Sequence, residues 1–264
     1  MTFIAKEGGY AVSRSGRFSA VTCFVLFTDF GPSGPYIGQM ESVLRQIAPN
    51  VPVINLLSNA PSADPRLSSY LLAALRHSFP VDSMFLAVVD PGVGGTRRAV
   101  VLQADGQIFV GPDNGLLNTV AVQAQNPQWS EIVWKPEQCS MSFHGRDLFA
   151  PIAAKLAINT ADDSLQGFDR NDLSDWPQDL AEVIYCDYYG NAMTGLRYLE
   201  AFVGKILNVN DRAIKQAGTF SDVEEHQAFW YKNSSGLVEI AVNKGRAEQQ
   251  LDLKPGMRIS FSAA

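Results

Sequence analysis

The chain has 264 residues, of which 46% are hydrophobic, 10% aromatic and 18% charged, a composition typical of a folded protein and not of a disordered one. This length suits one large α/β domain, or a medium domain followed by a small one. The formal net charge is −6 and lysine and arginine do not cluster, which argues against a nucleic-acid partner and favours small molecules.

Three cysteines, Cys23, Cys139 and Cys186, lie too far apart to form a CxxC pair. They predict neither a disulfide framework nor a zinc site, so a reducing cytoplasm fits best. We expect residues 1–20 to be an N-terminal extension and not a signal peptide. No apolar stretch approaches the roughly 20 residues that a membrane span needs, so no membrane partner is expected.

Apolar patterns alternate between strand and helix up to about residue 89. The predicted elements are the strand Val21–Phe27, the helix Tyr36–Ile47, the strand Val53–Leu57, the helix Arg66–Ser78 and the strand Met84–Val89. The order βαβαβ predicts a Rossmann-like parallel sheet with helices packed on its faces.

The next segments predict a hairpin and two more helices. Ala99–Gln103 and Ile108–Val110 flank an Asp-Gly pair that suits a primed turn, and helices are expected over Leu116–Gln125 and Leu148–Ala157.

A polar, loop-like segment over 160–180 is where we place the domain boundary. The sequence therefore predicts an α/β domain over 21–175. Short strands separated by turns follow, and they predict a small antiparallel β-barrel domain over 181–264.

Three loops place charged or glycine-rich residues where open α/β sheets form their binding crevice. Their sequences are TDFG (28–31), DPGVGGTRR (90–98) and SFHGRD (142–147). The glycines of the second loop allow Arg97 to fold back toward Asp90, so these two residues are compatible with one site. The alternative is a salt bridge that merely holds the loop. Neither GxGxxG nor a phosphate-loop pattern is present.

Of the three histidines, only His144 lies among Gly, Arg and Asp ahead of an apolar helix. We interpret His77 and His226 as surface residues. No second histidine or nearby cysteine completes a metal set, so His144 is a candidate general base or water-orienting group.

These motifs, together with GPDNG (111–115), DYYGN (187–191) and NSSGLVEIAVNKGRA (233–247), resemble those of the S-adenosylmethionine (SAM) hydroxide adenosyltransferases, or SAM hydrolases. The resemblance runs from Val21 over nearly the whole remaining chain. It implies that water attacks C5′ of the adenosyl group and that the products are adenosine and L-methionine, with no cofactor and no metal.

The resemblance also implies that Asp90, Arg97 and His144 form the water-handling set. The related fluorinases and chlorinases carry Tyr at the Asp position and Tyr-Ser in place of His144-Gly145, so the resemblance favours a hydrolase.

For binding, the resemblance implies that Asp29 meets the ribose hydroxyls and that Phe143 also contacts the substrate. The remaining contacts would come from Asp187 to the methionine ammonium, Tyr189 and Asn191 to adenine, and Ser234 to the methionine carboxylate. It further implies a homotrimer, with each site between the large domain of one subunit and the β-barrel of its neighbour. Without the resemblance, the DYYGN segment would be interpreted as a turn.

The sequence departs from the family at Gly34, where an Asp is usual, and at Asn55 and Ser58, which replace the Asp and His of a DxTH-like segment. These changes concern recognition of the methionine end. Two alternatives stay open: a halide-using 5′-halo-deoxyadenosine synthase, against which Asp90 and His144-Gly145 argue, and a catalytically silent adenosine- or SAM-binding module, which Gly34 and Ser58 make conceivable.

Overall fold

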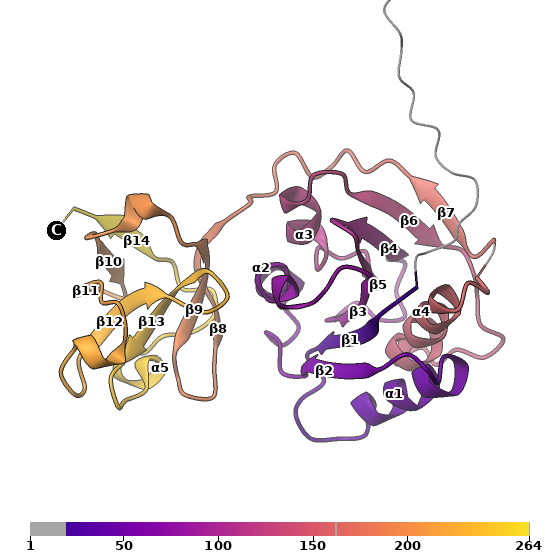
Figure 1. The fold of residues 1–264 in the computed structure, drawn as a ribbon, viewed down its shortest axis with the longest axis horizontal. Helices are drawn as coiled ribbons and strands as arrows, with labels where there is room; N and C mark the ends of the chain where they lie inside the picture. The colour runs from indigo at the N-terminus through magenta and orange to yellow at the C-terminus, as the bar shows by residue number, and fades with distance from the viewer. Residues whose placement is uncertain (1–19, 162, 264) are drawn as a thin grey trace, which may run out of the picture.

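The computed structural model describes residues 20–161 and 163–263, which form two lobes (Figure 1). The larger lobe is built on a seven-stranded sheet with the order β2-β1-β3-β5-β4-β6-β7. The smaller lobe contains two antiparallel sheets. The extension expected over 1–20 lies outside the described residues, except for its last residue.

Four neighbouring strands at one end of the large sheet run parallel to one another. They are β1 (Cys23–Thr28), β2 (Val53–Leu57), β3 (Ser83–Val88) and β5 (Gln107–Pro112). Every residue of β1 and β3 is buried, as expected for strands covered on both faces. The crossover helices are α1 (Tyr36–Ile47) and α2 (Pro65–Leu75), and a 3-10 turn η1 (Arg76–Ser78) extends α2. The predicted βαβαβ unit is thus confirmed.

The other half of the sheet is antiparallel. Strand β4 (Ala99–Ala104) forms the predicted hairpin with β5, and the turn residues Asp105 and Gly106 both have positive φ, as a primed turn requires. Strands β6 (Gln128–Ile132) and β7 (Leu165–Phe168) extend the sheet beyond β4. The expectation of a loop throughout 160–180 is therefore wrong, because β7 is a short edge strand in that segment.

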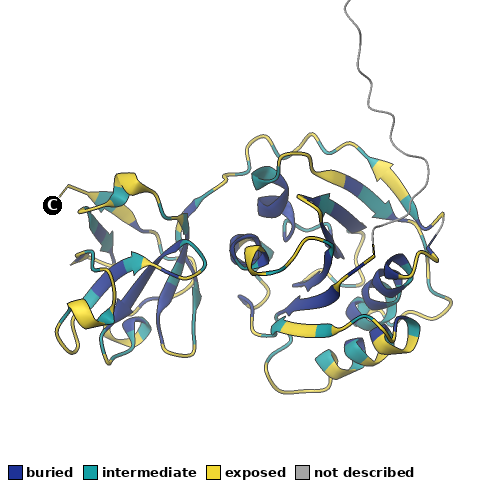
Figure 2. Ribbon diagram, viewed as in Figure 1, coloured by how far each residue is buried: buried dark blue, intermediate teal, exposed yellow. Residues whose placement is uncertain are grey.

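Helices cover both faces of the sheet, and Figure 2 shows their buried sides turned toward it. On one face α1 packs with α4 (Ala150–Ala157), which follows the π-helical turn η2 (Gly145–Phe149). On the other face lie α2 and α3 (Asn118–Gln123). In the described part of the chain, no helix has the length and apolar character needed to cross a membrane.

The smaller lobe surrounds its own core, in which Trp230, Val238 and Ile240 are fully buried. Its four-stranded sheet has the order β12-β13-β9-β8 and its three-stranded sheet the order β11-β10-β14. The strands are β8 (Leu180–Cys186), β9 (Ala192–Arg197), β10 (Ile206–Val209), β11 (Arg212–Ile214), β12 (Ala228–Lys232), β13 (Leu237–Val242) and β14 (Ser260–Ser262). The short helical segments are η3 (Glu200–Phe202), η4 (Phe220–Asp222) and α5 (Ala247–Gln250). Antiparallel pairing is confirmed, whereas a closed barrel is not.

The two lobes contact each other through α2 and β8. Arg66 forms a bidentate ion pair with Glu182, with N–O distances of 2.9 and 3.1 Å. The hydroxyl of Tyr70 donates to the carbonyl of Pro177 at 2.8 Å. These contacts join the small lobe to the α2 side of the large lobe.

Candidate active site

The candidate site lies at the carboxyl ends of the parallel strands. Asp29 directly follows β1, Asp90 lies two residues beyond β3, and His144 caps the π-helical turn η2. Because β1 and β3 are neighbours in register, their carboxyl ends meet at one edge of the sheet. Asp29 and Asp90 line one cavity there, together with His144.

Arg97 joins two of the predicted residues. Its Nε donates to both carboxylate oxygens of Asp90 at 3.0 Å, and a second guanidinium nitrogen forms an ion pair with the same carboxylate. That second nitrogen also lies 3.0 Å from Nδ1 of His144. The side chains of Asp90 and Arg97 are only 4% and 11% exposed, so the ion pair is largely removed from water.

The contact with Arg97 determines the tautomer of His144. A guanidinium group has only donors, so Nδ1 must accept, and the ring proton of the neutral imidazole is then on Nε2. Burial lowers the pKa of His144, and the positive charge of Arg97 lowers it further. His144 therefore presents an N–H donor at neutral pH.

Two close contacts hold the loops of this site. Gly94 has a positive φ, and a Cβ built there would lie 2.5 Å from the carbonyl oxygen of Met141, so the Asp90–Arg97 loop touches the His144 loop where only glycine fits. The carboxylate of Asp147 accepts from the backbone of Ser140 at 2.8 Å and pairs with Arg146. This brace fixes the segment that carries His144.

The cavity itself is small, about 120 Å³, and its lining is partly aromatic. Phe30 and Phe143 line it and meet edge to face at 5.7 Å. Gly145 packs against both rings, with a built Cβ 3.1 Å from Phe143. Oδ2 of Asp29 accepts a hydrogen bond from the backbone N–H of Ala63 at 2.9 Å. This bond does not involve Oδ1 of the same carboxylate.

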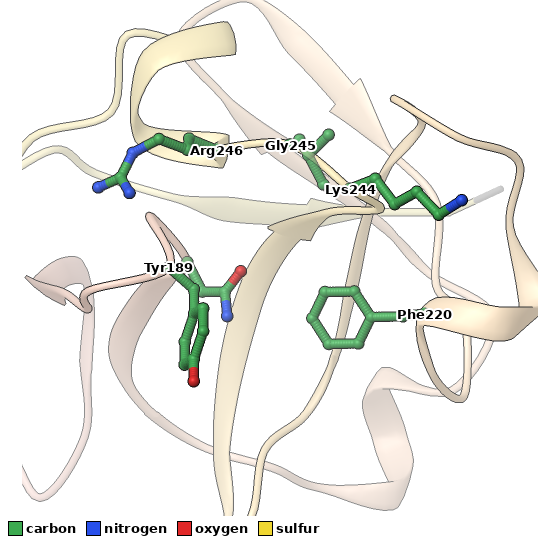
Figure 3. Close-up of a pocket in the computed structure, with 7 residues that line it drawn as sticks. Tyr189, Phe220, Lys244, Gly245 and Arg246 are labelled. Atoms are coloured by element: carbon green, nitrogen blue, oxygen red, sulfur yellow. The ribbon is translucent and has the colours of Figure 1, made fainter.

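The remaining predicted residues lie in the small lobe. Tyr189 and Asn191 line a separate pocket of about 610 Å³ with Phe220 and the segment 244–246, and this pocket shares no lining residue with the first cavity. Figure 3 shows Tyr189 and Phe220 on two sides of the hollow beneath that segment. Asp187 accepts from the backbone of Asn191 at 2.8 Å and so fixes the turn that carries Tyr189.

Ser234 is exposed in the turn between β12 and β13 and is not among the residues lining that pocket. The structure thus brings Asp29, Asp90 and His144 together, with Arg97 attached and Phe143 in the wall. It does not bring them together with the small-lobe residues.

Sequence reasoning missed Phe220 and Arg246. Phe220 begins the turn η4, which Thr219 and Asp222 close with a capping box, a pattern that is visible in the sequence. Arg246 donates to the carbonyl of Tyr188 at 2.7 Å and pairs with Glu248, so it holds the tip that presents Tyr189. No sequence motif signals that contact.

The three departures from the family fall in exposed or irregular positions. Gly34 has φ +126°, a conformation that an L side chain rarely adopts. Asn55 is exposed on β2. The carbonyl of Ser58 accepts from Gly31 at 2.6 Å, so Ser58 contributes its backbone to the loop after β1.

Within residues 20–161 and 163–263, no three His, Cys, Asp or Glu side chains converge as metal ligands would. The three cysteines are free thiols. The polar groups at the sheet edge are an ion pair and a neutral imidazole, which are suited to binding and polarising a small polar molecule.

The fold and the site define an α/β protein with a partly buried Asp–Arg–His arrangement at the carboxyl edge of its parallel strands. Residues 24–166 match the SAM hydroxide adenosyltransferase N-terminal domain and residues 181–260 match the C-terminal domain of the same family. The chain belongs to the SAM hydroxide adenosyltransferase family.

Individual relatives agree with this assignment. The chain is 36% identical over 252 residues to an (R)-S-adenosyl-L-methionine hydrolase of Thermus thermophilus, which covers 88% of this chain and 96% of the relative. It is 35% identical over 267 residues to a protein of the same name from Salinispora arenicola, covering 92% and 99%. A crystal structure of an uncharacterized conserved protein from Thermotoga maritima superposes with a TM-score of 0.80 at 30% identity, covering 90% and 99%.

Proposed function

We propose that this protein hydrolyses SAM: water attacks C5′ of the adenosyl group and the products are adenosine and L-methionine. The observation that carries the proposal is the partly buried contact of Arg97 with both Asp90 and His144, in a chain that belongs to this family. A C5′–O bond forms while the C5′–S bond breaks, the electron pair leaves with sulfur, and the proton that water loses is released to the solvent.

This chemistry needs few residues. The sulfonium leaves as a neutral thioether, so no general acid is required, and the reaction needs no cofactor because the substrate is already activated. When hydroxide character meets a sulfonium cation, charge is cancelled in the transition state, so a site removed from water lowers the barrier. Positioning the water adds to this effect.

The roles follow from the contacts. Arg97 supplies the positive charge that favours hydroxide character, while its ion pair with Asp90 fixes its orientation. In this proposal His144 donates its Nε2–H to the attacking water, because Nδ1 is occupied by Arg97. The tautomer supports a water-orienting role over that of a general base, the two roles considered from the sequence.

For the rest of the substrate, we place the ribose hydroxyls on Asp29 and one face of the nucleoside against Phe143. Adenine enters the small-lobe pocket beside Tyr189 and Asn191. Asp187 binds the methionine ammonium and Ser234 the carboxylate. The 610 Å³ pocket, with the Phe220 ring in its wall, supports the adenine assignment.

The same assignment requires two subunits for one site. A cavity of about 120 Å³ is below the roughly 300–1,000 Å³ of ordinary ligand pockets, and the small-lobe pocket of about 610 Å³ shares none of its lining residues. We therefore propose a homotrimer, in which the α/β domain (21–175) of one subunit meets the β domain (181–264), a barrel in this proposal, of its neighbour. The exposed aromatic tip formed by Tyr188 and Tyr189, 85% and 71% exposed, supports such a contact.

We place the protein in the cytoplasm because its three cysteines are free thiols, as a reducing compartment keeps them.

A halide-using synthase is not favoured, because Asp90, His144 and Gly145 are present. The test is to incubate the purified protein with SAM, with and without chloride, and identify the nucleoside formed. Adenosine in both samples is expected, and 5′-chloro-5′-deoxyadenosine or no turnover would contradict the proposal.

A further inference from the structure

A buried carboxylate outside the proposed catalytic set lies in the four-stranded sheet of the small lobe. Glu239 is 2% exposed on β13. Its neighbours Val238 and Ile240 point into the small-lobe core, so Glu239 points to the opposite face of the sheet. A buried acidic side chain is costly unless it is paired, so its partners indicate what it is used for.

Two side chains donate to this carboxylate. The hydroxyl of Tyr231, its cross-strand neighbour on β12, donates to Oε1. The side-chain amide of Asn233 donates to Oε2 at 2.8 Å. Burial raises the pKa of Glu239, while these two hydrogen bonds act in the opposite direction.

Asn233 transmits this contact to the turn that carries Ser234. Because its amide nitrogen is held by Glu239, its Oδ1 faces the turn and accepts from the backbone of Ser235 at 3.0 Å and of Leu237 at 2.9 Å. The carbonyl of Asn233 also accepts from Gly236 at 3.0 Å. The turn is thereby closed around Asn233, and Ser234 is left exposed at its tip.

We infer that Glu239 is a positioning residue for the methionine end of the substrate: it fixes the amide of Asn233, which fixes the turn that presents Ser234. This inference rests on the proposed function, in which Ser234 meets the methionine carboxylate. Glu239 itself does not touch the substrate, and the adenine pocket does not use this turn.

The network provides its own matched controls. Asn233→Ala removes the link to the turn. Glu239→Leu removes the acceptor, whereas Glu239→Gln keeps an oxygen for Asn233. Tyr231→Phe removes the other hydrogen bond of the same carboxylate and leaves the link to the turn intact. Val238→Ala, on the opposite face of β13, reports general loss of packing.

The experiment measures kcat and KM for SAM, and by calorimetry the Kd of SAM and of adenosine, on each variant of the full-length protein. Asn233→Ala and Glu239→Leu are expected to raise KM and the Kd of SAM about tenfold, with kcat and the Kd of adenosine within about twofold of wild type. Glu239→Gln, Tyr231→Phe and Val238→Ala are expected to bind SAM like wild type. The double variant Asn233→Ala/Glu239→Leu is expected to bind SAM no more weakly than Asn233→Ala alone, because both changes break the same link.

The inference is overturned if Asn233→Ala binds SAM like wild type, or if the Kd of SAM and the Kd of adenosine rise by the same factor. Asn233→Ala tests the inference even where Glu239→Leu fails to fold. A wild-type protein that binds SAM without hydrolysing it would contradict the proposed function while leaving the Kd comparison decisive. A wild-type protein that binds adenosine and not SAM would overturn both.

Discussion

Replacing Arg97 by alanine tests the electrostatic core of the proposed site. Three hydrogen bonds to Asp90 and one contact to His144 are lost together, and the Asp90 carboxylate, 4% exposed, is left without its cation. Removing one electrostatic donor from a reaction centre costs about 10²–10³ in kcat, and breaking a buried ion pair costs about 3–5 kcal/mol of stability. We therefore expect a fall in kcat of at least roughly 10²-fold.

The pH dependence distinguishes this role from a purely structural one. In the wild type the pKa of His144 is lowered by burial and by Arg97, so the neutral imidazole persists below the ordinary histidine range. If the neutral form is required, the acidic limb of kcat lies below about pH 6.5. In Arg97→Ala one cause of the lowering is gone, so the limb moves to higher pH. Arg97→Lys keeps the charge, and its limb should stay near the wild-type position.

The assay is kcat for adenosine formation between about pH 5 and 8, with thermal unfolding of each variant measured alongside. A folded Arg97→Ala protein with kcat within threefold of wild type would refute the role given to Arg97. An acidic limb that stays in place in this variant would refute the coupling of Arg97 to His144.

Three further predictions concern the site and its assembly. His144→Ala should lower kcat by roughly 10²-fold and leave the calorimetric Kd of adenosine unchanged, and near wild-type turnover would show that another group orients the water. Light scattering should show a trimer. Asp90→Asn and Asp187→Ala are each expected to be strongly impaired alone, and mixing the two kinds of subunit should restore part of the activity. Full activity in a monomer would exclude shared sites. Gly34→Asp places a carboxylate at a position with φ +126°. It should lower the free energy of unfolding by about 1–2 kcal/mol in chemical denaturation and should not lower KM for SAM. A stable variant with a lower KM would show that the loop accepts a side chain there.

Much of the large lobe was predictable because its elements are long and strongly periodic. The helix Tyr36–Ile47 was predicted with the bounds that the structure gives it. The hairpin was predictable from Asp105-Gly106, since few pairs of neighbouring residues readily adopt positive φ at both positions. In contrast, β7 has four residues including a glycine, with none fully buried, so no alternation distinguishes it from a loop.

The candidate site was predictable in its residue types but not in its contacts. The sequence placed Asp90, Arg97 and His144 in strand-end loops, and the family resemblance assigned them one task. The 3.0 Å contact between Arg97 and Nδ1 of His144, which determines the tautomer, depends on loops 47 residues apart and left no local signal. The link from Glu239 through Asn233 to the Ser234 turn is likewise a property of paired strands, which periodicity alone does not reveal.

Attack of water at C5′ is the central claim, and the fate of the water oxygen tests it most directly. SAM is incubated with the purified protein in water labelled with a heavy oxygen isotope, and both products are analysed by mass spectrometry. The label is expected in the 5′-hydroxyl of adenosine, with L-methionine unlabelled. Unlabelled adenosine, or label in the methionine product, would contradict the account.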